Sequence, residues 1–214
     1  MHNLETPRGH LRMSASITIG QHLVAPHMAE FSSQYPEIDI ELNLTNRRVD
    51  IIGEGFDVVI RVGSLHDSTL VSKYLGSDNA QLFASSAYLK HSGTPTSIED
   101  LEKHRLITMS DSPQSHQWIF TDSQGHSIST PVQAFAAIND LTAIQRMVMD
   151  GMGIAFLPRY FDSEENKLVR IFDEWQSPNF DYHALYPSHR GMTLKLRVWL
   201  DFLCEKFAQF RQMK

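Results

Sequence analysis

The order in which strand-like and helix-like runs follow one another constrains this chain most. A short extended run at residues 11–15 precedes an apolar stripe with helical spacing over residues 24–35. Residues 38–44 then alternate apolar and polar side chains with a period of two, and residues 58–62 form an apolar run typical of a strand buried on both faces. Gly53 and Gly55 mark a short turn of helix between these two runs. This order, strand, helix, strand, turn of helix, strand, predicts an α/β block with parallel strands.

A second α/β block is predicted after residue 80. Its strand candidates are residues 106–109, 118–120, 132–138 and 154–157. Ser97 is predicted to cap a short helix, and Asn139 to cap a longer one whose inner face is Leu141, Ile144 and Val148.

The chain ends in a strand-like run at residues 182–186 and a helix with a wide apolar stripe that needs a large surface to cover. The first block is the simplest partner. The chain would then cross between blocks near residues 82 and 184, giving lobe I over 9–81 plus 185–214 and lobe II over 82–184. The predicted fold is therefore α/β, with two Rossmann-like lobes joined by two crossover strands that act as a hinge and leave a cleft.

Polar side chains follow the ends of the predicted strands, where open parallel sheets bind their ligands. They are Ser14, Ser16, Thr18, Thr45, Arg61, Val62 and Gly63 in the first block, and Met109, Ser110, Asn139 and Phe156 in the second. Hydroxyls, amides, backbone donors near helix starts and one arginine suit a small organic anion. The sequence predicts a pocket that binds such a ligand rather than a site that transforms it.

Each candidate also has a structural explanation. The hydroxyls of residues 14–18 suit helix capping as well as ligand binding. Arg61 can equally pair with Asp57 or Asp67. Phe156 suits a core position with one edge showing. The functional interpretation therefore depends on these groups converging, and not on any one of them.

Composition excludes several classes of protein. The 214 residues carry a formal net charge of −6, so the chain by itself is a poor candidate for gripping nucleic-acid phosphates. No run approaches the ~18 apolar residues of a membrane span. Residues 1–12 contain no apolar run that could serve as a signal peptide, so a cytoplasmic location is expected. The single cysteine, Cys204, excludes an internal disulfide.

The residues needed for catalysis or metal binding are nearly absent. His22 and His27 are five apart and off a common helical face, no His-Glu-x-x-His run occurs, and no metal site or cofactor is expected. There is no Gly-x-Ser-x-Gly elbow. Cys204 suits a packed thiol more than a nucleophile. Asp111 and His116 are the only acid–base candidates near the predicted site, so we expect no enzyme.

Several short runs suggest a family. They are residues 9–13 (GHLRM), Pro26 with Phe31, Tyr35-Pro36 and Ile38, residues 55–63 (GFDVVIRVG), 83–85 (FAS), 88–89 (YL), 100–101 (DL) with His104, 139–141 (NDL), and 151–158 (GMGIAFLP). In this order and spacing they resemble the effector-binding domain of LysR-type transcriptional regulators, over residues 9 to about 210. The resemblance implies a fold like that of the type 2 periplasmic binding proteins.

The resemblance also implies how a parent protein would work. Family members carry an N-terminal winged helix-turn-helix domain, absent here, through which alone they bind DNA; residues 1–8 would be the end of its linker helix or a leader. Effectors would contact Ser16, Thr18, Thr45, residues 61–63, 109–110 and 156. A homodimer would place the helix around Val24, Met28 and Phe31 against the partner's helix from Asn139 to Gly151, with a tetramer in the intact protein and no membrane contact.

Two other functions share the predicted scaffold. A solute-binding protein of a transporter would need a signal peptide or a lipoprotein cysteine near its N-terminus. A two-lobed enzyme would need an acid, base or nucleophile in the cleft, and turnover of candidate metabolites would distinguish it from a sensor. Effector identity, target genes and the direction of regulation are not encoded in recognisable motifs.

Overall fold

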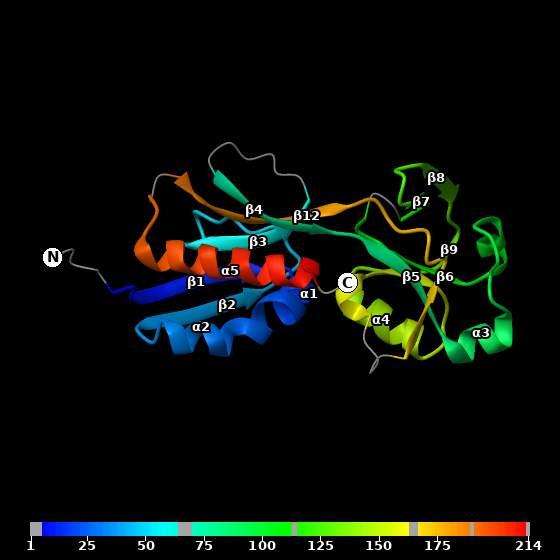
Figure 1. Ribbon diagram of the computed structural model, residues 1–214, viewed down its shortest axis with the longest axis horizontal. Coiled ribbons are helices and arrows are strands. Elements are labelled where there is room, and N and C mark those ends of the chain that lie inside the picture. The colour runs from blue at the N-terminus through cyan, green and yellow to red at the C-terminus, as the bar shows by residue number, and fades with distance from the viewer. Residues whose placement is uncertain (1–5, 64–69, 113–114, 163–166, 189–190, 213–214) are drawn as a thin grey trace. The chain divides into compact units, whose positions relative to one another are not determined.

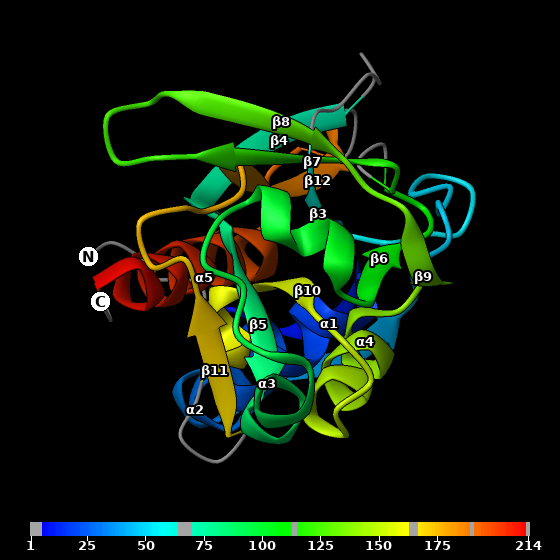
Figure 2. The same ribbon diagram turned by 90° about the vertical axis from the view of Figure 1, so that its right-hand side faces the viewer.

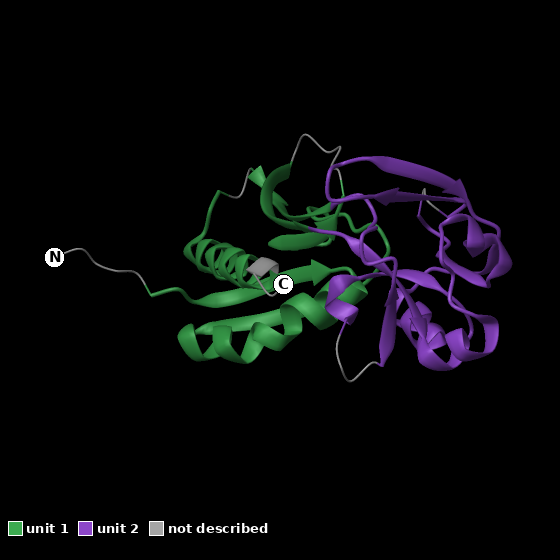
Figure 3. Ribbon diagram, turned by 45° about the vertical axis from the view of Figure 1, so that its right-hand side comes forward, with its two compact units in different colours: residues 1–77, 180–214 green, residues 78–179 purple. Residues whose placement is uncertain are grey.

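The chain folds into two compact units, one formed by two separate segments of the chain and the other by the single segment between them. A computed structural model describes residues 6–63, 70–112, 115–162, 167–188 and 191–212. Unit 1 comprises Met1–Ser77 with Phe180–Lys214, and unit 2 comprises Asp78–Asn179 (Figure 3). The chain therefore passes between the units twice, slightly before each of the crossings expected near residues 82 and 184.

Unit 1 is built on a five-stranded sheet with the order β2-β1-β3-β12-β4. The strands are β1 (Gly9–Ala15), β2 (Ile38–Leu44), β3 (Val58–Val62), β4 (Leu70–Asp78) and β12 (Phe180–Pro187). β1 pairs in parallel with both β2 and β3, whereas β12 runs antiparallel to β3. The period-two pattern at residues 38–44 and the buried strand at residues 58–62 are confirmed.

The helix expected over residues 24–35 begins earlier and changes type along its length. It consists of α1 (Ile17–Ile19), the π-helix η1 (Gly20–Val24), the 3₁₀-helix η2 (Ala25–His27) and α2 (Met28–Gln34). Pro26 lies in the 3₁₀ segment. A proline has no amide to donate to the preceding turn, which explains why the regular α-helix resumes only at Met28.

The last helix, α5 (Leu194–Gln212), belongs to unit 1 and lies along β1 (Figure 1). Trp199 is fully buried and meets the Phe31 ring edge-on at 4.8 Å between centroids. Val24 and Phe31 are themselves 0 % exposed. The side chains of Val24 and Phe31 therefore fill the core of their own unit, so a dimer contact of the helix around Val24, Met28 and Phe31 would use its other side chains.

In the described part of unit 2, seven strands form three small sheets. They are β5 (Ala80–Ser85), β6 (Leu106–Met109), β7 (Gln117–Thr121), β8 (Ser127–Pro131), β9 (Ala134–Ile138), β10 (Ala155–Pro158) and β11 (Leu168–Ile171). β5 lies between β10 and β11 with antiparallel pairing, β6 pairs in parallel with β9, and β7 pairs antiparallel with β8. A parallel bridge between Leu106 and Ile154 joins β6 to the start of β10.

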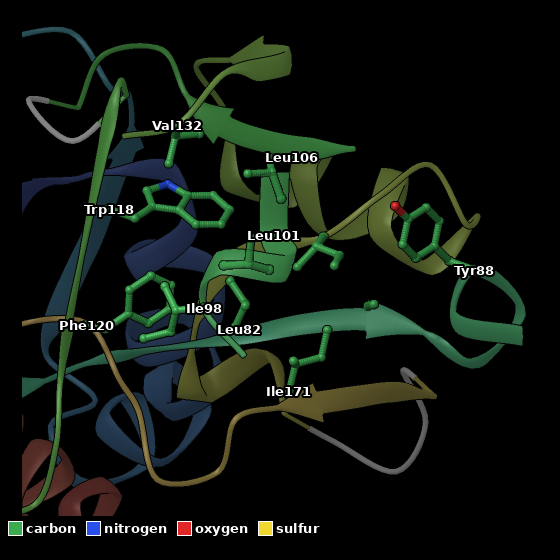
Figure 4. Packing of buried hydrophobic residues seen from close by; sticks show 11 residues of the cluster. Leu82, Tyr88, Ile98, Leu101, Leu106, Trp118, Phe120, Val132 and Ile171 are labelled. Atoms are coloured by element: carbon green, nitrogen blue, oxygen red, sulfur yellow. The ribbon is translucent and has the colours of Figure 1, made fainter. Parts of the chain in front are cut away.

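Two apolar clusters cover the two faces of this unit. Its helices are α3 (Ser86–Ser92), η3 (Glu99–Lys103), α4 (Leu141–Met149) and η4 (Arg159–Phe161). One cluster, which includes Leu82, Trp118 and Phe120, packs beneath η3 and the β7–β8 hairpin (Figure 4). The other, which includes Phe83 and Ile144, packs beneath α4 on the opposite side (Figure 2). Neighbouring residues of β5 point to opposite clusters, as strand geometry requires.

Two predicted helix caps in unit 2 are wrong. The side chain of Asp140, and not that of Asn139, caps α4 by accepting a hydrogen bond from the Ala143 amide at 2.8 Å. The η3 helix begins after Ile98 and has no side-chain cap, so Ser97 does not act as one. The strand expected over residues 132–138 is divided, since β8 ends at Pro131 and β9 begins at Ala134.

None of the helices that the structure describes is long and apolar enough to cross a membrane.

Candidate functional site

Three of the predicted binding residues lie side by side at one edge of the unit 1 sheet. Ala15 is level with Leu44 of β2 and with Ile60 of β3. The next residues along these strands are Ser16, Thr45 and Arg61. Because the three strands are parallel and adjacent, these side chains meet at the carboxyl edge, where open α/β sheets bind ligands.

The Arg61 side chain reaches across the end of β1. Its Nη1 donates to the Thr45 carbonyl oxygen at 3.0 Å, and its Nη2 donates to the Arg47 carbonyl oxygen at 3.3 Å. Burial, and to a lesser degree the positive charge of Arg47, lowers the pKa of the Arg61 guanidinium from its ordinary value. The arginine thus keeps its charge in a partly buried place and gives two of its donors to neutral peptide oxygens.

No carboxylate within the described ranges pairs with Arg61. Asp57, one of the two expected partners, binds Lys195 Nζ at 2.8 Å and accepts a hydrogen bond from the Arg12 amide at 2.9 Å. Asp67, the other, lies outside the described residues. The interpretation of Arg61 as a partner of Asp57 is therefore wrong.

The three hydroxyls expected after the first strand have different environments. Ser14 lies inside β1 and is 0 % exposed, and its Oγ has no hydrogen-bond partner among the described residues, so its placement beyond the strand is wrong. Ser16 precedes α1 but its side chain does not cap it. Asn46 Oδ1 instead accepts from the Ile17 amide at 3.1 Å. Thr18 is buried in the first turn, with 7 % of its surface exposed.

Val62 and Gly63 follow Arg61, and Val62 lines a groove in unit 1. Val62 is 45 % exposed, and the Gly63 amide donates to the Asp181 carbonyl oxygen at 3.0 Å. Gly63 has a φ of +94°, a conformation that favours glycine. The groove encloses about 730 Å³. It is lined by residues 46–52, Val59, Arg61, Val62, Leu70, Ser72 and Leu185.

The groove includes residues that the sequence analysis missed. Arg47 and Arg48 directly follow the predicted Thr45–Asn46 pair, and this doublet of guanidinium groups at a strand end is a signal that could have found them. Ser72 comes from β4, which joins the sheet beyond β12. Nothing in the local sequence places Ser72 near Arg61.

The predicted residues of unit 2 fall into two groups. The Ser110 amide donates to the Ile138 carbonyl oxygen at 2.9 Å, which brings Ser110 beside Asn139 at the carboxyl ends of β6 and β9. Met109 packs against the cluster beneath α4, whereas Phe156 packs against the cluster beneath η3. Met109 and Phe156 therefore pack against different apolar clusters of unit 2.

Phe156 is a partly buried core residue, as its structural explanation predicts. Its ring lies 5.0 Å from that of Trp118 and 5.1 Å from that of Phe120, measured between centroids. Unit 2 also has a cavity of about 760 Å³ between η3 and the β8–β9 connection, where Arg105 stacks on Phe135 at 4.6 Å. No predicted binding residue lines that cavity.

The acid–base candidates are solvent-exposed. Asp111 accepts a hydrogen bond from the neighbouring Ser110 Oγ at 3.2 Å, and His116 is exposed at the start of the β7 region. Within the described parts of the chain, no three His, Cys, Asp or Glu side chains are grouped as a metal site requires.

Comparison with known proteins identifies similar sequences over nearly the whole chain. The LysR substrate binding domain family matches residues 4–208. An HTH-type transcriptional regulator of Xanthomonas campestris is 32% identical over 203 residues, which cover 92% of this chain and 59% of that relative. The HTH-type transcriptional regulator CrgA of Neisseria meningitidis is 30% identical over 208 residues, covering 95% of this chain and 69% of its own length. The chain thus spans about three fifths to two thirds of these relatives.

Solved structures give the same result. The regulatory domain of CrgA, described as a LysR-type transcriptional regulator, superposes with a TM-score of 0.84 at 29% identity, covering 94% of this chain and all of that one. The full-length Vibrio cholerae virulence activator AphB gives a TM-score of 0.79 at 28% identity, covering 93% of this chain and 69% of AphB. The α/β units of this protein thus have the two-lobed, periplasmic-binding-protein-like fold of these regulatory domains.

Proposed function

Because this chain belongs to the LysR substrate binding domain family, we propose that it senses a small-molecule effector for a transcription regulator acting in the cytoplasm. DNA binding would belong to an N-terminal helix-turn-helix domain of the parent protein. The effector-binding role follows from the family, whereas the ligand and the site rest on the geometry of the strand ends.

We assign the carboxylate of the effector to Arg61, at the edge that also carries Ser16, Thr18 and Thr45. The observation that carries this assignment is the state of the Arg61 guanidinium, which is partly buried and bonded, within the described residues, only to two neutral carbonyl oxygens. A buried charge is stable when an opposite charge and hydrogen bonds compensate it. A carboxylate on the remaining Arg61 donors would supply both.

Ser110 and Asn139 of unit 2 are also proposed as effector-binding residues. Ser110 and Asn139 offer a hydroxyl and an amide at neighbouring strand ends, and Val62 and Gly63 extend the unit 1 surface. A ligand that binds one arrangement of the two units better than another shifts the population toward it. Such a shift is how an effector would reach the DNA-binding part of the parent protein.

The proposed homodimer uses the exposed side of α2 and the α4 helix of a second copy, with a tetramer in the intact protein. Met28 is partly exposed and is the residue of the predicted trio that can reach such a partner, since Val24 and Phe31 are buried. In α4 the residues 141–143 and 145–146 are likewise at least partly exposed. Regulatory domains of this family form oligomers, which supports this arrangement.

Binding of small acids tests the proposed site. A thermal-shift screen of carboxylic acids finds a binder, because a ligand of the native state raises Tm by mass action. Calorimetry then compares variants. We expect Arg61→Gln to weaken binding about 10- to 100-fold, as for loss of a charge-assisted hydrogen bond, and Thr18→Val about fivefold, with far-ultraviolet circular dichroism unchanged.

Arg105→Gln is the matched control, since Arg105 stacks on Phe135 far along the chain from the proposed site. The affinity of the Arg105→Gln variant for the same acid should equal that of the wild type. Unchanged affinity in both Arg61→Gln and Thr18→Val would refute the placement of the effector.

A further inference from the structure

The groove in unit 1 combines an apolar interior with a basic rim. Its volume of about 730 Å³ lies within the range of small-molecule pockets. The apolar side chains that line it are Val49, Ile51, Ile52, Val59, Val62, Leu70 and Leu185. Ile52 is 39 % exposed and Val62 is 45 % exposed. Ile51, Val59 and Leu185 are at most 6 % exposed and belong to a core cluster, so the exposed apolar surface that a ligand can cover at this groove is that of Ile52 and Val62.

The charges at the rim divide into compensated and uncompensated groups. Arg47 forms a two-pronged ion pair with Glu54, at 2.8 Å and 2.5 Å. The Asp50 carboxylate also lines the groove and accepts a hydrogen bond from the neutral Gly53 amide at 2.9 Å. Within the described residues, the Arg48 side chain has no hydrogen-bond or ion-pair partner, and Arg61 has only carbonyl oxygens. Arg48 and Arg61 are therefore the cations that an anionic group can engage.

The groove has a polar group at the end opposite Arg61. Arg61 of β3 is level with His183 of β12, and His183 Nδ1 lies 3.1 Å from Ser72 Oγ on the next strand, β4. Neighbouring strands are spaced about 4.8 Å apart, so Arg61 and Ser72 lie roughly 10 Å apart across the sheet. The apolar interior thus extends between a cationic end and a hydroxyl end.

We propose that the effector is an elongated carboxylic acid whose apolar body lies in this groove. Its carboxylate binds Arg61 and Arg48, its body covers Ile52 and Val62, and a hydrogen-bonding group roughly 10 Å away meets Ser72. This inference rests on the proposed role of Arg61 and adds the shape and polarity of the ligand. It excludes compact, fully polar anions such as inorganic phosphate as the cognate ligand.

Chain length is the first test. Calorimetry on the 214-residue protein compares butanoate, hexanoate and octanoate. Burial of a methylene group contributes enough to raise affinity about fourfold, so octanoate should bind roughly 10- to 15-fold more tightly than hexanoate. Ile52→Asn should reduce this gain per methylene by half or more. Val71→Asn is the matched control, because Val71 is 36 % exposed in the same unit but does not line the groove.

The distant hydroxyl is the second test. An eight-carbon acid extends roughly 10 Å, so 8-hydroxyoctanoate places its hydroxyl near Ser72. It should bind severalfold more tightly than octanoate in the wild type, and this preference should disappear in Ser72→Ala.

The outcomes separate this inference from the proposed function. Equal affinity for butanoate and octanoate, with binding still lost in Arg61→Gln, overturns the groove assignment and leaves the carboxylate site intact. An unchanged gain per methylene in Ile52→Asn also overturns it. Failure of every acid to bind, together with tight binding of a phosphate ester or an amine, overturns both.

Discussion

Gly153→Ala is the substitution whose effect follows most directly from the structure. Gly153 is buried between α4 and β10. A Cβ at this position would overlap the carbonyl oxygen of Arg105 and lie 3.1 Å from its carbonyl carbon. Both neighbours are backbone atoms and cannot rotate away, so the two segments must move apart.

The free-energy cost of Gly153→Ala follows from the backbone hydrogen bonds that this movement breaks. The Arg105 oxygen accepts from the Ile154 amide at 2.9 Å, and the Ile154 oxygen accepts from the Ile107 amide at 2.9 Å. Each such hydrogen bond contributes about 1 kcal/mol net, and overpacking a dense interior costs a further 1–3 kcal/mol. We therefore expect the free energy of unfolding of unit 2 to fall by about 3–5 kcal/mol.

Urea unfolding followed by tryptophan fluorescence measures this loss. Trp118 is 3 % exposed and belongs to the same cluster as Ile154, so its emission reports on the affected region. Gly20→Ala is the control, since its Cβ would meet only the end of the Leu44 side chain, which can change rotamer. We expect Gly20→Ala to lower the free energy of unfolding by about 1 kcal/mol or less. A loss below about 0.5 kcal/mol in Gly153→Ala, or equal losses in both variants, would refute the reasoning.

Two further predictions concern α4 and α2. Asp140→Ala should lower the free energy of unfolding by about 1 kcal/mol in urea, because it removes the α4 cap, whereas Asn139→Ala should change it little; the reverse order would contradict the assigned cap. Met28→Asp should shift the protein from dimer toward monomer in sedimentation equilibrium, because a carboxylate would be desolvated in the proposed α2–α4 contact. Dimerisation at unchanged strength would exclude that contact.

Most of the fold was predictable where one face of an element is buried. Residues 38–44 alternate because burial on one side of a sheet selects every second side chain, and residues 58–62 lack alternation because both faces are covered near their start. By contrast, β8 (Ser127–Pro131) is exposed at nearly every position and carries no apolar pattern. Its pairing with β7 follows from the turn at residues 122–126 and from cross-strand hydrogen bonds, which a hydrophobic pattern does not encode.

The carboxyl edge of unit 1 was predictable for a similar reason. Once three strands are parallel, the residues that follow them must share an edge, and Ser16, Thr45 and Arg61 do so. Ser14 was wrongly placed because it lies inside the predicted run of residues 11–15, one residue before the end of β1, where its side chain is buried in the core. The helix cap predicted at Asn139 was wrong because its neighbour Asp140 has equal capping chemistry, and only the backbone conformation selects between them.

The local charge of the groove, and not the net charge of the chain, decides what it binds. A net charge of −6 disfavours anions in general, but at physiological ionic strength charges more than about 8 Å away are largely screened. A guanidinium at 4 Å contributes about 4 kcal/mol at an effective dielectric constant of 20. Distant carboxylates are therefore screened, and the two guanidinium groups of Arg61 and Arg48 outnumber the Asp50 carboxylate that lines the same groove. Arg61 also donates to the carbonyl oxygens of Thr45 and Arg47, so the proposed ligand on Arg61 would act directly on the segment that borders the groove.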